Sequence, residues 1–248
     1  MGDHVVTLWT WNLGGFEIPI TNVVVMSWIA MGVIILWAFL STRKLRQVPR
    51  GLQNSAEIVV ETLNNFAENN IHHGKSFAPY LGTIGLFLAI SNTIGALFMT
   101  KLTNGIICPP TRTMAVPVAL AIMTIVIAIG AGIKRKGIIG FIKRLFKPMA
   151  IMFPFNLLEF IIKPLSLSMR LFGNVFGAYV AMELLLDAIP WGLPAVACLY
   201  FDLFDGGLQT YVFVLLTTLY ISEEVEIEEE EPEKKPFFEE VSAWTQQY

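Results

Sequence analysis

The sequence KPLSLSMRLFGNVFGAYV, Lys163 to Val180, places one arginine inside a long apolar region. Arg170 lies near the centre of that region, and none of these eighteen residues is acidic. A charged side chain at bilayer depth costs roughly 3 kcal/mol on insertion scales. Snorkelling to the membrane surface and a structural ion pair are the alternatives to a functional role, and the central position of Arg170 disfavours snorkelling. The sequence therefore predicts a functional charge inside a membrane.

Small and polar residues share one helical face with Arg170. At about 100° per residue, the face spans only about 100° of the helix circumference. The large apolar side chains of the region point elsewhere, so a second helix could approach this face closely. The face consists of Arg170 with Ser166, Gly173, Asn174, Gly177 and Ala181.

The composition indicates a polytopic membrane protein. The chain has 248 residues, of which 54% are hydrophobic and 15% charged, and its mean hydropathy is +0.60. Crossing a hydrocarbon core of about 30 Å takes about 20 apolar residues. The predicted fold is all-α, with several transmembrane helices, one amphipathic surface helix and a long, strongly tilted C-terminal helical hairpin. The predicted spans are 21–40, 79–100 and 114–133, and the hairpin comprises 149–189 and 195–221.

The surface helix is predicted over residues 52–71, where apolar residues recur at steps of three and four. Basic residues gather after the first span and between Lys134 and Lys147, which predicts a cytoplasmic side there and an N-terminus outside. Ten of the twenty acidic residues fall between Glu223 and Glu240. We expect residues 1–222 to form a single membrane domain and residues 223–248 to be an acidic, disordered cytoplasmic tail.

Two polar stripes follow the predicted hairpin. In an antiparallel pairing, Gln209 is expected opposite Arg170. Carboxylates at membrane depth need water or a partner, so the stripes predict a water-filled half-channel open to the outside. Asp187 and Asp205 have helix capping as an equal alternative. The stripes are Tyr179, Glu183 and Asp187 on the first hairpin helix and Asp202, Asp205 and Gln209 on the second.

Glu159 and Lys163 are four residues apart, toward the predicted cytoplasmic half. Such residues pair on a helix surface, so a simple structural ion pair is one interpretation. The other is a second hydrated path that leads inward from Arg170, lined by Asn156, Glu159 and Asn92.

Two segments together resemble a known family. NLLEFIIKPLSLSMRLFGNVFGAYV, Asn156 to Val180, and GLQTYVFVLLTTLYIS, Gly207 to Ser222, are similar to subunit a of the F-type ATP synthase, the membrane stator beside a rotating ring of c subunits. Weaker similarity covers nearly the whole chain. The resemblance implies that Arg170 is the essential arginine, Asn174 the asparagine of the RLFGN motif and Gln209 the glutamine of the last helix.

The resemblance also implies a non-catalytic, ion-translocating subunit without cofactor or metal. Ser166, Gly173 and Gly177 would face the rotor, and Glu159, Tyr179, Glu183 and Asp202 would line the ion paths. The implied partners are the c-ring, the peripheral stalk subunit b and membrane lipid, with no nucleic acid. The implied location is an energy-transducing membrane, with the bacterial plasma membrane favoured.

The chain departs from the family pattern at several positions. Tyr179 stands where many members have an acidic residue or histidine, and the carboxylate follows one turn later as Glu183. Asp202 stands where some members carry histidine, and Thr113 and Ala115 replace the usual Asp and Asn. We therefore expect the polar residues of the outer path to be rearranged, rather than absent, in this chain.

A stand-alone secondary transporter or channel is the main alternative function, because buried charges mark those proteins too. It would need a substrate cage and two symmetric halves, and the sequence shows neither. An intramembrane protease or haem protein is disfavoured because all three histidines, His4, His72 and His73, fall outside the apolar spans.

Overall fold

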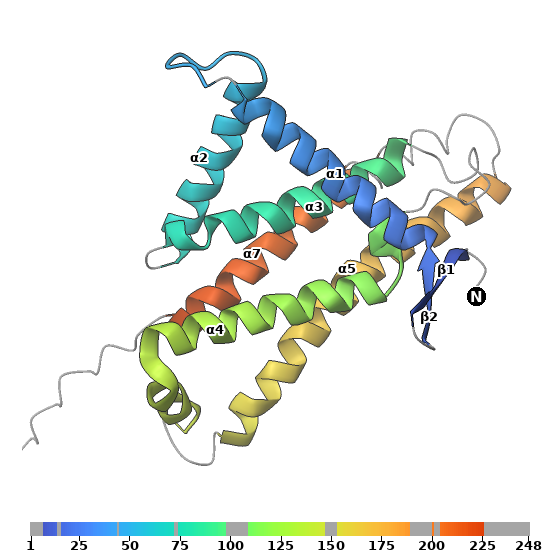
Figure 1. Cartoon of the computed structure of the whole chain (residues 1–248). Coiled ribbons are helices and arrows are strands. Elements are labelled where there is room, and N and C mark those ends of the chain that lie inside the picture. Colours follow the sequence, from blue (N-terminus) through green and yellow to red (C-terminus); the bar gives the residue numbers. More distant parts are fainter. Residues whose placement is uncertain are drawn as a thin grey trace, which may run out of the picture.

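The computed structural model describes residues 7–13, 16–43, 45–71, 74–97, 109–146, 153–188, 200 and 204–225. Long helices dominate it, as the sequence predicts for an all-α polytopic membrane protein (Figure 1). Its elements are β1 (Thr7–Leu13), β2 (Phe16–Thr21), α1 (Asn22–Thr42), α2 (Leu52–Asn70), η1 (Gly74–Ser76), α3 (Ala78–Leu97), η2 (Pro110–Arg112), α4 (Ala115–Leu145), α5 (Phe153–Ala188) and α7 (Gly206–Val225).

Two of the described helices are long and apolar enough to cross a membrane, α1 over Asn22–Thr42 and α4 over Ala115–Ile142. On α1, large side chains such as Trp28, Ile35 and Phe39 are more than half exposed. A helix that displays apolar side chains in this way suits hydrocarbon rather than water. The first predicted span therefore agrees with α1 to within two residues.

Helix α4 runs twelve residues beyond the predicted end of the third span at residue 133. Its axis breaks at Gly137, which has a φ of 72° and a ψ of 165°. Glycine adopts a positive φ at little cost because it has no Cβ. Residues 138–145 turn away from the apolar part of α4 and lead back toward the start of α5 (Figure 1).

Helix α5 is continuous over 36 residues and includes Pro164. At 1.5 Å per residue its length is about 54 Å, well beyond the bilayer core, so it must lie tilted in a membrane. Helix α7 runs antiparallel to it and ends at Val225 rather than at the predicted residue 221. The predicted turn of the hairpin and the residues after 225 lie outside the described part of the chain.

Helix α2 closes the third side of a triangle with α1 and α3 (Figure 1). Its apolar stripe packs against the bundle. Leu63 lies so close to Gly82 of α3 that its Cδ1 atom would be 2.8 Å from an added Cβ, and the Phe66 and Tyr211 ring centres are 6.2 Å apart. Leu52, at the start of the predicted stripe, is exposed instead.

The all-α prediction lacks one small element. Residues 7–13 and 16–21 form a two-stranded antiparallel sheet, β1 with β2, that leads directly into α1 (Figure 1). Its physical basis is the alternation of apolar and polar residues in TLWTWN and FEIPIT, which favours strands over a helix.

Candidate functional site

Arg170 lies on the open face of α5. Ser166, Gly173 and Gly177 of the predicted small-residue face are exposed with it, and Asn174 is half-buried. An added Cβ on Gly173 or Gly177 would meet nothing within 4 Å. Leu167 and Leu171 lie beside this face, about 60° and 100° from Arg170 around the helix, and turn toward the bundle, since they are 1% and 0% exposed. The fold therefore leaves the small-residue face of α5 uncovered by the described residues.

Arg170 itself makes no ion pair and no hydrogen bond with any residue that the structure describes. Lys75 and Lys163 do form ion pairs within these ranges. Both lie nearer the basic end of the bundle, the end at which α1 and the apolar part of α4 run into basic residues. Arg170 is thus held on a helix surface as an uncompensated charge within the described chain.

Gln209 lies inside the bundle rather than on the open face. It is 7% exposed, and its side-chain Nε2 has no hydrogen-bond partner among the described residues. No hydrogen bond joins Gln209 to Arg170 among the described residues.

The hairpin register follows from the ion pair between Lys163 and Glu223. Counting seven residues along each antiparallel helix from that pair places Arg170 opposite Leu216, whereas the sequence analysis paired it with Gln209. The Lys163 and Glu223 side chains each lean toward the N-terminus of their own helix, so their Cα atoms are not level with each other. This accounts for part of the difference between Leu216 and Gln209. Gln209 lies farther along the hairpin toward η2 than Arg170, by up to about two helical turns.

Asn92 of α3 joins three elements. Its Nδ2 donates to the Gly206 carbonyl at 3.1 Å and lies 3.5 Å from Thr210 Oγ1, both on α7. Its Oδ1 accepts from Thr111 of η2 at 3.2 Å. One of the two interpretations of Glu159 and Lys163 includes Asn92 on an inward path, and these contacts do not support that prediction. Asn92 lies at the η2 end of the bundle, opposite the basic end, because it is near the C-terminus of α3.

Arg112 of η2 packs on Tyr179 of α5. Its guanidinium carbon lies 3.1 Å from the centre of the tyrosine ring, the geometry of a cation–π contact. Arg112 Nη2 is buried and has no hydrogen-bond partner in the described ranges. Arg112 is not among the site residues predicted from the sequence. The only signal was a basic residue directly after the PPT sequence.

At the basic end, Lys163 joins the two hairpin helices. Its Nζ lies 3.2 Å from Glu159 of α5 and 2.8 Å from Glu223 of α7. The Lys163 side chain is 14% exposed, whereas the Glu159 and Glu223 side chains are 52% and 44% exposed. The predicted pairing of Glu159 with Lys163 is confirmed. Glu223, which the sequence analysis assigned to the tail, belongs to the last helix.

The predicted carboxylates of the outer path are described only in part. Glu183 and Asp187 have backbone positions in α5, but their side chains lie outside the described residues, as does all of Asp202. Asp205 is half-buried and immediately precedes the first residue of α7. Because Asp205 itself has π-helical backbone, helix capping and the outer path both stay predictions for this residue.

Comparison with known proteins gives concordant results. The family model described as "ATP synthase A chain" matches residues 24–222. The chain is 33% identical over 231 residues to "ATP synthase subunit a, chloroplastic" of Stigeoclonium helveticum, covering 91% of each chain. It is 35% identical over 231 residues to the protein of the same name from Oedogonium cardiacum, covering 91% of this chain and 89% of that one. The chain therefore belongs to the ATP synthase A chain family.

Proposed function

We propose that this chain is the ion-translocating stator subunit of an F-type ATP synthase, and that Arg170 is the fixed charge past which the carboxylates of a rotating c-ring move. The observation that carries the proposal is the open small-residue face of α5, on which Arg170 has no partner among the described residues. Family membership and the two chloroplastic relatives support it.

The charge of Arg170 has a physical task at that place. A rotor carboxylate that has lost its ion would be stranded in hydrocarbon, at a cost of several kcal/mol. Next to a guanidinium it is stabilised as an anion and releases its ion there. The same positive charge repels cations, so it blocks a direct leak between the two sides. Each elementary charge that crosses gains about 2.3 kcal/mol per 100 mV, which is the energy that drives rotation.

Two aqueous half-channels would meet at the rotor face. The outer one would run along the η2 end of the hairpin, and the inner one along its basic end. The outer residues are Asn174, Tyr179, Glu183, Asp202 and Gln209, and Glu159 belongs to the inner path. The ion pairs of Lys163 with Glu159 and Glu223 support a charged, partly hydrated inner mouth.

The remaining assignments follow from this role. The subunit is non-catalytic, because ATP forms elsewhere in the complex. Its partners are the c-ring, the peripheral stalk subunit b and membrane lipid. The N-terminus lies outside and the basic loops lie in the cytoplasm or the equivalent compartment. An energy-transducing membrane is the location of the family, and a bacterial origin stays a prediction.

Cross-linking tests the proposed contact with the rotor. Cysteines at Ser166 and Gly173, introduced singly into the assembled complex, should form disulfides with cysteines on the facing helix of the c subunit. Ser168 supplies the matched control, because it lies on the same helix, is 2% exposed and faces the bundle. Cross-links from Ser168→Cys but not from Ser166→Cys or Gly173→Cys would show that another face of α5 meets the ring, and would refute the proposal.

A further inference from the structure

We propose that the β1–β2 hairpin is a lipid-binding element that lies in the membrane interface at the N-terminal end of α1, with one face toward the acyl chains. The inference concerns residues 7–21, which take no part in the function proposed above. It rests on the strand register, on the exposure of Trp9 and on the direct connection to a membrane-spanning helix.

The register makes the hairpin two-faced. Residues directly opposite each other in an antiparallel pair lie on the same face, and successive residues alternate between faces. The pairs on one face hold only apolar residues, and the pairs on the other hold mostly polar ones. The apolar pairs are Trp9 with Ile20, Trp11 with Ile18 and Leu13 with Phe16, and the other pairs are Thr10 with Pro19 and Asn12 with Glu17.

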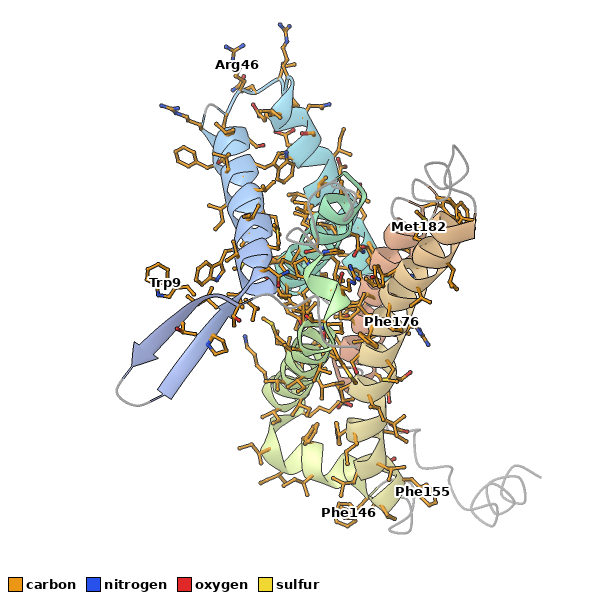
Figure 2. All side chains as sticks on the ribbon, turned by 90° about the vertical axis from the view of Figure 1, so that its right-hand side faces the viewer. Trp9, Arg46, Phe146, Phe155, Phe176 and Met182 are labelled. Atoms are coloured by element: carbon orange, nitrogen blue, oxygen red, sulfur yellow. The ribbon has the colours of Figure 1, made fainter. Side chains whose placement is uncertain are left out.

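The apolar face is open at Trp9, whereas Ile20, its partner nearer α1, is half-buried. Trp9 is 69% exposed and lies at the outer edge of the molecule, away from the helical bundle (Figure 2). An isolated two-stranded hairpin is marginally stable in water at best, and three pairs of apolar positions on one face would be costly to hydrate. The hairpin therefore needs an apolar neighbour on this side.

The connection to α1 identifies that neighbour as lipid. Strand β2 ends at Thr21 and α1 begins at Asn22, so no linker separates the hairpin from the membrane span. The hairpin is thereby held at the level where hydrocarbon gives way to headgroups. Tryptophan is enriched at that level, since its ring is apolar and its N–H is polar. On the opposite face of the register, Thr10 and Pro19 are exposed, and the Thr10 hydroxyl suits water.

Site-directed spin labelling of the reconstituted complex tests this assignment. The background carries Cys108→Ser and Cys198→Ser. Nitroxides at Trp9→Cys and Ile20→Cys report the apolar face, and those at Thr10→Cys and Pro19→Cys report the other face of the same strands. Ile35→Cys on α1, where the native side chain is 68% exposed, supplies the reference for hydrocarbon.

The measured quantities are collision rates with oxygen, which partitions into lipid, and with a water-soluble nickel chelate. We expect positions 9 and 20 to resemble position 35 in favouring oxygen, and positions 10 and 19 to favour the nickel chelate. Low collision rates with both reagents at positions 9 and 20 would mean that a protein covers the face. If the nickel chelate reached positions 9 and 20 as readily as position 10, the apolar face would lie in water. Either result overturns the proposal.

Discussion

The Nζ of Lys163 lies 2.8 Å from Glu223 Oε2 and thereby ties α5 to α7 across the basic end of the hairpin. Lys75 and Glu68 form an ion pair of the same length, 2.8 Å, on the surface of the molecule. The two pairs differ in the exposure of the lysine side chain, which is 14% for Lys163 and 69% for Lys75. Because the two ion pairs have the same length and differ in the burial of the lysine, Lys75 is a matched control for Lys163.

Lys163→Met should destabilise the hairpin, because it removes the mostly buried cation that pairs with both Glu159 of α5 and Glu223 of α7 and so links the two helices. We expect a loss of about 1 kcal/mol or more, seen as a lower melting temperature of the purified complex. Lys75→Met should change the melting temperature little, as for most exposed pairs. Equal losses for the two variants would contradict the importance of burial at Lys163.

Gly206→Ala should disturb the junction between α3 and α7. The added Cβ would lie 3.1 Å from Asn92 Cβ and 3.5 Å from its Cγ, so the two helices must separate slightly. Overpacking of this kind costs about 1–3 kcal/mol. We expect weaker assembly and slower ion-driven ATP synthesis.

Gly207→Ala is the control for Gly206→Ala, because an added Cβ there meets nothing within 4 Å. Alanine also favours helix over glycine, so this variant should assemble at least as well as wild type. If Gly206→Ala left assembly and ATP synthesis unchanged, this prediction would be wrong, and the contact between Asn92 and Gly206 would tolerate a wider spacing of α3 and α7.

Tyr179→Leu should free the guanidinium of Arg112 at the η2 end, whereas Tyr179→Phe should retain the contact. The aromatic ring supplies the cation–π attraction, worth about 0.5–2 kcal/mol, and phenylalanine keeps the ring. We expect ATP synthesis in vesicles to fall more in Tyr179→Leu than in Tyr179→Phe. A larger loss in Tyr179→Phe would assign the role of Tyr179 to its hydroxyl instead.

The sequence predicts much of the membrane fold, because apolar length and helical periodicity are local properties. Helix α1, helix α2 and the face of Arg170 follow directly from them. The β1–β2 hairpin has a local signal too, in the alternation around Trp9 and Trp11 and in the adjacent Gly14 and Gly15 between the strands. This signal is weaker than that of the spans, because each strand is only six or seven residues long.

Other features depend on contacts between distant segments and have no local signal. Asn92 meets Gly206 and Thr111 only once three elements are packed. The hairpin register depends on helix tilt and side-chain direction, which a simple count of residues from the turn ignores. The stacking of Arg112 on Tyr179 likewise joins two segments that are far apart in the sequence.

Arg170→Ala provides the most direct test of the central claim that this guanidinium couples ion flow to rotation. The complex is reconstituted in vesicles, and ATP synthesis is measured under an imposed ion gradient and membrane potential. Met169→Ala is the control, because Met169 is the preceding residue and is 50% exposed. We predict that Arg170→Ala abolishes ion-driven synthesis while Met169→Ala retains it. Synthesis at the wild-type rate in Arg170→Ala vesicles would contradict the account.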